Sequence, residues 1–267
     1  MTTEVWFDWL RVRAIARRHA YVMVRSPHRL FDVTVWPMVD VLLFGSIGVF
    51  VSGGDGGRAA FAYLLAGIIL WHVVYQSQIS LSTGFLEETW SRNLLNLMVS
   101  PLKEFEYVAG VALFGLAKLV LGVGLTALLA FGAYAFDISG MGLSLIPIAA
   151  ILLVVGWAIA LFVMGVVLRY GSGAEALAWG VLFAVMPLSG VFYPVESLPA
   201  LVRPIARVLP TTHAFAAMRV VLDGGDIPWG TIGLGCLGAG VLAALALGFL
   251  LRMLKVFRAR GFISRYS

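Results

Sequence analysis

Long apolar segments alternate with short polar ones along most of the chain. Six runs approach or exceed the length of a helix that crosses about 30 Å of hydrocarbon. They are 33–51, 61–83, 107–135, 143–168, 176–192 and 229–254. The fifth run is short and contains Pro187, which predicts a helix that stops inside the membrane. The glycine-rich segment 52–58 can only be a loop. The pattern predicts an all-α integral membrane protein with six transmembrane helices.

The segment before the first run is amphipathic at helical spacing. Its polar stripe consists of Glu4, Asp8, Arg11, Arg18 and Arg25, and Trp6, Trp9, Val12 and Ala16 lie off that stripe. Ile15 interrupts the polar side, and Ser26-Pro27 ends the helix. We expect residues 1–32 to form a cytoplasmic helix in the membrane interface. A helix in the cytosol is the alternative.

The composition agrees with a membrane protein and excludes a soluble domain. Of the 267 residues, 61% are hydrophobic and 12% charged, with a mean hydropathy of +0.95, whereas charged residues make up about a quarter of soluble domains. The basic excess gathers near the chain ends beside apolar runs, which indicates membrane orientation rather than a nucleic-acid partner. The first 32 residues have no apolar signal-peptide core, so the first span is expected to direct insertion. The single cysteine, Cys236, excludes an internal disulfide.

The basic residues also predict the orientation. Fourteen Lys and Arg residues flank one side of the six predicted spans, and four flank the other. Because basic loops stay in the cytoplasm, both termini are expected to be cytoplasmic in a cytoplasmic (inner or plasma) membrane, with 255–267 as a tail. The region 193–228 is then external.

That external region is rich in proline. Pro187, Pro194, Pro199, Pro204 and Pro210 force short helices joined by turns, predicted at 199–203 and 212–222. The segment is too apolar for open water, and irregular backbone at membrane depth needs protein or a water-filled cavity around it. We therefore expect a re-entrant hairpin that closes the outer end of a path, with Gly190 as its bend and Pro194 as its turn. A plug that does not move is the alternative.

The second link, 84–106, differs from an ordinary connector. Glu87 and Glu88 stand at its start, Leu94, Leu95 and Met98 follow with helical spacing, and Pro101 ends the pattern. A short helix at the cytoplasmic membrane surface is predicted, with a solvated connector as the alternative. The fourth link, 169–175, is too short for more than a turn.

Two ionisable residues, Asp40 and Lys118, fall inside predicted spans. Such residues are costly in hydrocarbon and are functional candidates. Each requires a partner, and their similar calculated depths allow them to pair with each other. Snorkelling to the cytoplasmic interface is the alternative.

Motifs for catalysis, metal or nucleotide binding are missing from the sequence. No GxxxxGK[ST] occurs, so ATP-driven work requires a second polypeptide. The GxGxxG match at 233–238 lies inside a predicted span, where small residues favour close helix packing. The four histidines occur singly, which argues against a metal site. No cofactor is expected in this chain.

Two segments before the last span, SGVFYPVESLP and LPTTHAFAAMR, resemble permease subunits of type-2 ABC exporters of the polysaccharide and drug export families, as does the second link. The resemblance implies that the permease forms a homodimer and binds two copies of a separate ATPase, which holds ATP and Mg. It also implies two groups of site residues. The ATPase-coupling group is Glu87, Glu88, Trp90, Arg92, Asn93 and Pro101, braced by Arg169 and Glu175; the external hairpin group is Pro187, Gly190, Pro194, Leu198, Pro199, Pro210 and His213.

The implied function is export of an amphiphile such as a drug, lipid, glycolipid or lipid-linked polysaccharide. An ion-driven secondary transporter is the alternative, but the repeated half with broken helices typical of that class is not visible. A membrane-embedded lipid enzyme requires a catalytic cluster that the sequence does not offer.

Overall fold

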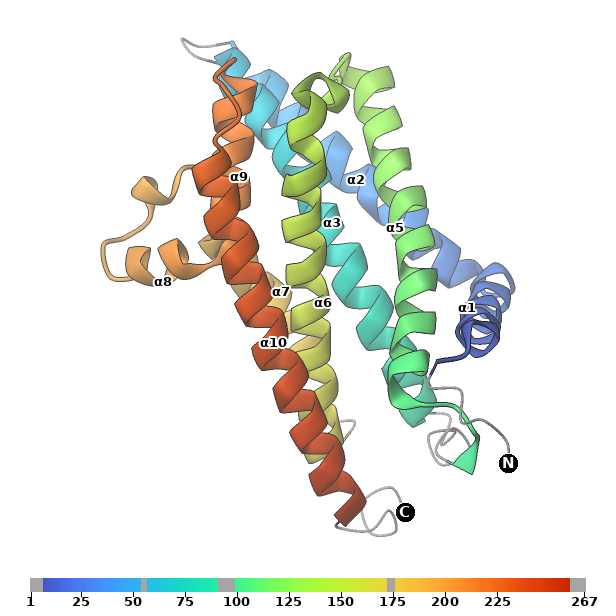
Figure 1. Cartoon of the computed structure of the whole chain (residues 1–267). Coiled ribbons are helices and arrows are strands. Elements are labelled where there is room, and N and C mark those ends of the chain that lie inside the picture. Colours follow the sequence, from blue (N-terminus) through green and yellow to red (C-terminus); the bar gives the residue numbers. More distant parts are fainter. Residues whose placement is uncertain (1–6, 54–56, 91–98, 172–175, 260–267) are drawn as a thin grey trace.

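The computed structural model describes residues 7–53, 57–90, 99–171 and 176–259, and within these ranges the regular structure is entirely helical (Figure 1). Five helices are long and apolar enough to cross a membrane. They are α2 (Pro27–Val51), α3 (Gly57–Trp90), α5 (Glu104–Tyr134), α6 (Leu145–Tyr170) with the preceding 3₁₀ helix η1 (Ile138–Ser144), and α10 (Trp229–Ala259).

The fifth predicted run is shorter than a complete span. Helix α7 (Ala176–Leu188) has 13 residues, about 20 Å of helix at 1.5 Å per residue. It ends one residue after Pro187, and the chain then turns at Ser189 and Gly190. The expectation of a helix that stops early is therefore confirmed, whereas the described chain has five helices of spanning length rather than six.

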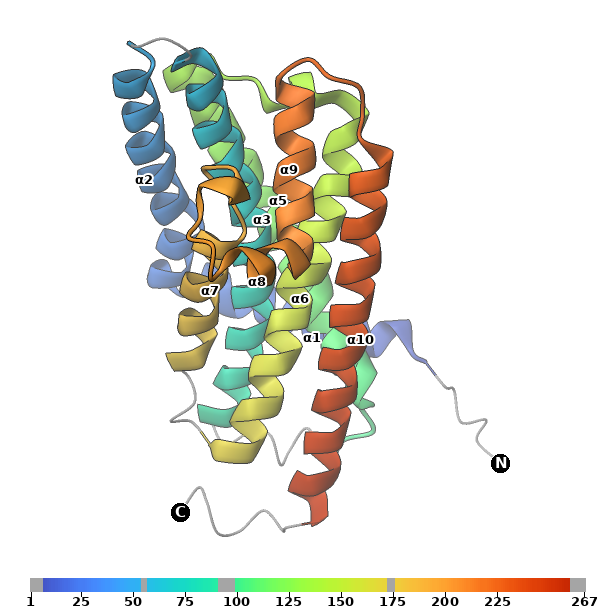
Figure 2. The ribbon, with the colours of Figure 1, turned by 90° about the vertical axis from the view of Figure 1, so that its left-hand side faces the viewer.

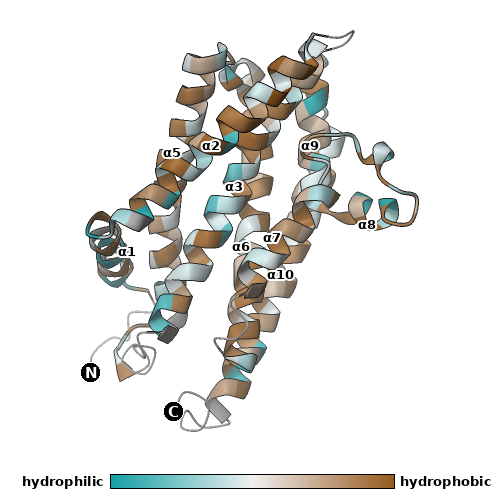
Figure 3. Cartoon of the chain, turned by 180° about the vertical axis from the view of Figure 1, so that it is seen from behind, coloured by the Kyte–Doolittle hydropathy of each residue, from teal (hydrophilic) through white to brown (hydrophobic). Residues whose placement is uncertain are grey.

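Helices α3 and α6 form the centre of the bundle. About 67% of the apolar window of α3 and 72% of that of α6 are buried, against 28% for α2 and α5 and 22% for α10. Gly156 allows the close approach of α6 to α3, because a Cβ there would overlap the Ser77 hydroxyl. The outer helices present mostly apolar side chains, and polar positions interrupt α3 and α1 (Figure 3).

Helix α1 (Trp9–Val24) lies across the N-terminal part of α5, beside the start of α2 (Figure 1). The Asp8 side chain caps it by accepting from the Leu10 N–H at 2.9 Å. Its buried residues are Val12, Ile15 and His19, and Ile15 packs against Gly110 of α5. The buried face of α1 is therefore rotated from the predicted apolar side. Ile15 lies on the buried face, which packs on α5, and Trp9, predicted on the apolar side, is half exposed.

The segment after α7 folds back on the bundle (Figure 2). It contains the 3₁₀ turn η3 (Val195–Ser197), the short helix α8 (Arg203–Val208) and α9 (Pro210–Leu222), which packs between α6 and α10. The second predicted short helix is confirmed with its start at Pro210. The first, expected at 199–203, is wrong: these residues form a turn, and α8 begins at Arg203 because Pro204 occupies its first turn.

Candidate functional site

The last turn of α3 carries two carboxylates that bind arginines from α1 and α2. Arg29 Nη1 lies 2.6 Å from Glu87 Oε1, and Arg18 places Nη1 2.5 Å from Glu88 Oε1 and Nη2 3.0 Å from Glu88 Oε2. Glu88 is buried, so its bidentate arginine partner supplies the charge that burial requires. Carboxylates at the C-terminal end of a helix are disfavoured by the helix dipole. The arginines therefore stabilise this end of α3.

A third carboxylate, Glu106, organises the start of α5. It accepts from the Asp8 N–H at 2.8 Å and the Lys103 N–H at 2.9 Å, and Arg11 Nη1 lies 3.4 Å from it. Arg11 also donates to the Pro101 carbonyl at 2.7 Å. We call the three pairs Arg11–Glu106, Arg18–Glu88 and Arg29–Glu87 the ionic clamp. It attaches both ends of the segment 91–103 to α1 and α2.

The clamp changes the interpretation of the predicted coupling residues. Glu87 and Glu88 do not begin a separate helix, because α3 continues through them to its last residue, Trp90. Arg92, Asn93 and Glu175 lie outside the described residues. Arg169 lies in the exposed last turn of α6, with its guanidinium 5.3 Å from the centre of the Tyr170 ring.

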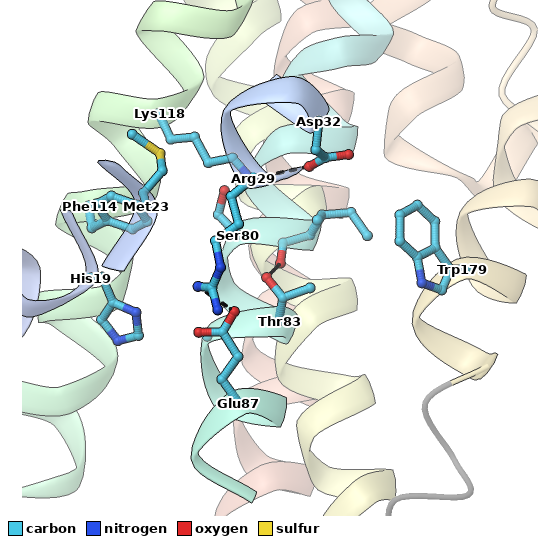
Figure 4. Close-up of a pocket in the computed structure, with 12 residues that line it drawn as sticks. His19, Met23, Arg29, Asp32, Ser80, Thr83, Glu87, Phe114, Lys118 and Trp179 are labelled. Carbon is cyan, nitrogen blue, oxygen red and sulfur yellow. Dashed lines mark hydrogen bonds and ion pairs between the residues drawn. The ribbon is translucent and has the colours of Figure 1, made fainter. Parts of the chain in front are cut away.

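A cavity of about 310 Å³ opens above the clamp, between α1, α2, α3, α5 and α7 (Figure 4). Arg29 and Glu87 form one ion pair in its wall, and Lys118 Nζ lies 3.6 Å from Asp32 Oδ2 in a second. The rest of the lining consists of His19, Met23, Ile79, Ser80, Thr83, Gly84, Phe114 and Trp179. The cavity therefore combines balanced charges with aromatic and aliphatic walls, which suits an amphiphilic molecule.

The pairing of Asp40 with Lys118, which the sequence left open, does not occur in the structure. Lys118 faces Asp32, and Asp40 lies 3.3 Å from Nε2 of His72 on α3. Helix α2 is strongly inclined to α5 (Figure 1), so equal distances along the two helices do not correspond to equal depths. Lys118 is consequently level with Asp32, two helical turns before Asp40.

Contacts continue from the cavity along α2, α3 and α7 towards the hairpin. The Tyr75 hydroxyl donates to Asp32 at 3.3 Å, and the Tyr75 ring lies 6.0 Å from that of Trp179. Further along, Asp40 faces His72, and Phe44 stacks on Phe192 with ring centroids 4.3 Å apart. We call these seven residues the aromatic–acidic ladder: Asp32, Asp40, Phe44, His72, Tyr75, Trp179 and Phe192.

The hairpin residues are held by hydrogen bonds from hydroxyl and guanidinium groups, mostly to backbone carbonyls, and by close packing. The Ser189 and Thr211 hydroxyls are 2.6 Å apart, and Thr212 donates to the Ala206 carbonyl at 2.6 Å. Arg219 donates to the Gly190 carbonyl at 2.6 Å, and Gly190 adopts a φ of +64°, which favours glycine. These bonds join the α7 turn, α8 and α9 into one unit.

The other predicted hairpin residues occupy defined positions in this unit. The carbonyl of Pro187 accepts a hydrogen bond from the Tyr193 hydroxyl. Pro194 precedes η3, and Leu198 follows η3 and is buried. Pro199 begins the next turn. Pro210 and His213 on α9 pack beside Gly235 of α10, and Pro210 also packs against Gly238. The interpretation of the GxGxxG match as a packing motif is thus confirmed for these two glycines.

Comparison with known proteins identifies the family of the chain. The family model of the ABC-2 family transporter proteins matches residues 47–251. The chain belongs to the ABC-2 transporter family. The permease is similar to the daunorubicin resistance ABC transporter permease protein DrrB1 of Streptomyces coeruleorubidus, with 23% identity over 82% of this chain and 77% of the relative. It is also similar to the inner membrane transport permease YadH of Escherichia coli K12, with 22% identity over 78% of this chain and 84% of the relative.

These matches show that the chain is a membrane permease of an ABC transporter. Within the described residues no three His, Cys, Asp or Glu side chains form a group that could hold a metal ion.

Of the clamp residues, the sequence singles out only Glu87 and Glu88 as site residues. From the sequence, Arg11, Arg18 and Arg29 are interpreted as orientation charges, Arg11 and Arg18 are also placed in the polar stripe, and no site role is assigned to Glu106 or to the cavity residue Asp32. The position of Glu106, three residues after the Lys103 cap, is the one local signal that could have revealed its role.

Proposed function

We propose that this permease is the membrane subunit of an ATP-driven exporter. Two copies of the chain bind two copies of a separate ATPase, which carries ATP and Mg. The complex moves an amphiphile outward across the cytoplasmic membrane. The name of the DrrB1 relative, which refers to daunorubicin resistance, supports a drug as one candidate substrate.

The observation that carries this proposal is the ionic clamp around segment 91–103. We place the ATPase contact on this segment, with Arg92 and Asn93 at its centre. Glu87 and Glu88 act as transmitting residues, since their carboxylates bind Arg29 and Arg18. A displacement of the segment then moves α1, α2 and α3 together.

The path starts at the cavity of Figure 4 and follows the aromatic–acidic ladder to the hairpin. ATP binding draws the two ATPases together and moves α1, α2 and α3 through the clamp. The hairpin, with Phe192 against Phe44, acts as the outer lid. Leu201, just before α8, and Ile205 and Val208 within it are exposed apolar side chains, which supports a position of the hairpin in the outer leaflet.

The orientation has a direct test. Val99 is exposed at the α1 end and Ser139 at the opposite end. In a Cys236→Ala background, a membrane-impermeant thiol reagent added to intact cells should label Ser139→Cys and leave Val99→Cys unlabelled. Labelling of Val99→Cys alone would reverse the proposed direction of the whole path.

The decisive experiment tests whether the permease binds a separate ATPase. Affinity purification of the full-length permease should recover, in equal amount, a protein that contains a P-loop nucleotide-binding motif. Arg92→Ala should reduce that recovery, whereas Glu196→Ala, in an exposed position of the hairpin, should not.

Reconstituted vesicles then separate the two transporter classes. Export by the purified complex should require ATP and persist after ion gradients are abolished. Transport that follows an ion gradient without nucleotide would contradict the proposal and favour a secondary transporter.

A further inference from the structure

Among the carboxylates of the membrane-spanning helices whose side chains the structure describes, Asp40 has a different kind of partner from the others. Asp32, Glu87, Glu88 and Glu106 each face a lysine or an arginine. Asp40 faces the imidazole of His72, with Nε2 3.3 Å from Oδ2. Lysine and arginine supply a permanent charge, whereas an imidazole is positive only when protonated. Asp40 therefore lacks the fixed positive partner that its counterparts have.

The partner of Asp40 is itself incompletely bonded. His72 is 1% exposed, and neither of its ring nitrogens has a hydrogen-bond partner within the described chain. The 3.3 Å contact to Asp40 is an ion-pair distance without hydrogen-bond geometry. Buried polar atoms are almost always hydrogen-bonded. The Asp40 side chain is 24% exposed, so a bound group can still reach it.

A series of ring contacts connects the Asp40–His72 pair to the cavity of Figure 4. The Tyr75 ring lies 5.7 Å from His72 and 6.0 Å from Trp179, which lines the cavity of Figure 4. One helical turn beyond Asp40, Phe44 is covered by Phe192 of the hairpin. The faces of aromatic rings attract cations and their bodies bind apolar groups. The site thus offers one negative charge and an apolar wall.

We propose that Asp40, with His72, Tyr75 and Trp179, binds the positively charged group of an organic cation with an apolar body. The cation moves from the cavity along the ladder and pauses below the Phe44–Phe192 stack. This inference rests on the proposed export function and narrows its substrate class to cationic amphiphiles. An amphiphilic anion of the same size is rejected by the same carboxylate.

The test uses two hydrophobic ions of similar shape and opposite charge. Purified full-length permease in lipid nanodiscs is titrated with radiolabelled tetraphenylphosphonium or tetraphenylborate, and binding to empty nanodiscs is subtracted. We expect tetraphenylphosphonium to bind at least about tenfold more tightly, which corresponds to about 1.4 kcal/mol. Equal or weaker binding of this cation to the wild-type protein would overturn the proposal, whether or not any variant folds.

Variants at Asp40 provide the second arm. Asp40→Asn should weaken cation binding about tenfold and leave anion binding equal or stronger, and Asp40→Glu should keep the preference for the cation. Asp226→Asn is the matched control, because it removes an exposed acid between α9 and α10. Cation binding that is unchanged in a folded Asp40→Asn protein would also overturn the proposal. Recovery of the ATPase by the same preparations tests the export proposal separately. An exporter of neutral or anionic substrates would recover the ATPase but would not bind the cation more tightly than the anion.

Discussion

The ionic clamp and the hairpin are both assembled from segments distant in sequence, but different interactions hold them. In the clamp, three arginines of α1 and α2 meet carboxylates of α3 and α5, and the Arg18 side chain is 42% exposed. In the hairpin, buried hydroxyls, backbone carbonyls and glycine contacts join α7, α8 and α9, and Thr211, Ala214 and Phe215 are fully buried.

This difference indicates how each region behaves when the protein moves. The arginines of the clamp are partly exposed, so salt screens these pairs in part and they can re-form in a shifted geometry. Close-packed contacts act as one unit and have few alternative arrangements. We therefore expect the clamp to adjust during transport and the hairpin to move as a body.

The largest effect should come from the contact between the hairpin and α3. A Cβ on Gly67 would lie 2.5 Å from the Val191 carbonyl oxygen, a backbone atom that cannot rotate away. Gly67→Ala should destabilise the protein by about 2–3 kcal/mol through overpacking. Thermal unfolding in detergent measures this. Gly132→Ala, where nothing lies within 4 Å of the added atom, is the control and should be nearly neutral.

A smaller loss is expected in the clamp. Glu106→Ala removes two backbone hydrogen bonds and the Arg11 pair, which should cost about 2 kcal/mol. Raising the salt concentration from about 0.05 to about 0.5 M should shrink this loss through screening and leave the loss in Gly67→Ala unchanged. A salt-independent loss in Glu106→Ala would remove the contrast between the two regions. Glu196→Ala, an exposed acid, serves as the control.

The hydroxyl pair of the hairpin should contribute less. Thr211→Val leaves the shape but removes the bond to Ser189, and should cost about 1 kcal/mol. The double variant Ser189→Ala/Thr211→Val should lose less than the sum of the single losses, because Ser189→Ala alone leaves the Thr211 hydroxyl without this bond, whereas in Thr211→Val the Ser189 hydroxyl keeps its bond to the Val185 carbonyl. Strictly additive melting shifts would argue against this bond.

The smallest effect concerns pH at α1. Burial lowers the pKa of His19 from its ordinary value of 6.5, and the Glu88 carboxylate opposes this. The unfolded chain therefore binds the proton first as the pH falls, so His19 reduces stability below about pH 6.5 and has no such effect above it. Unfolding measured at about pH 7.5 and 5.5 should show a decline that is a few tenths of a kcal/mol smaller in His19→Gln. An identical decline in both proteins would exclude His19 as its source.

The sequence predicted the elements that local chemistry determines. Apolar runs of sufficient length gave α2, α3, α5, α6 and α10, and Pro210 marked the first residue of α9. Pro187 correctly indicated that the fifth run is not an ordinary span. Each of these features depends on residues that are neighbours in sequence.

Features that depend on the relative placement of helices could not be predicted. Arg18 and Glu88 are 70 residues apart, and their pairing follows from the way α1 crosses the bundle. Lys118 pairs with Asp32 rather than Asp40 because α2 is inclined, and helix inclination leaves no mark in hydropathy. The phase of α1 was misjudged because its buried face meets α5, whereas the prediction assumed lipid.

Under the proposed function, ATP-driven motion must separate the hairpin from α2 for export. Phe44→Cys and Phe192→Cys, introduced together in Cys236→Ala, replace two rings that stack at 4.3 Å and can be joined by a short bifunctional thiol reagent. The crosslinked complex, reconstituted with its ATPase, should bind the ATPase normally and lose export, and the single-cysteine proteins treated alike should keep it. Export at the full rate through the crosslinked protein would contradict the account.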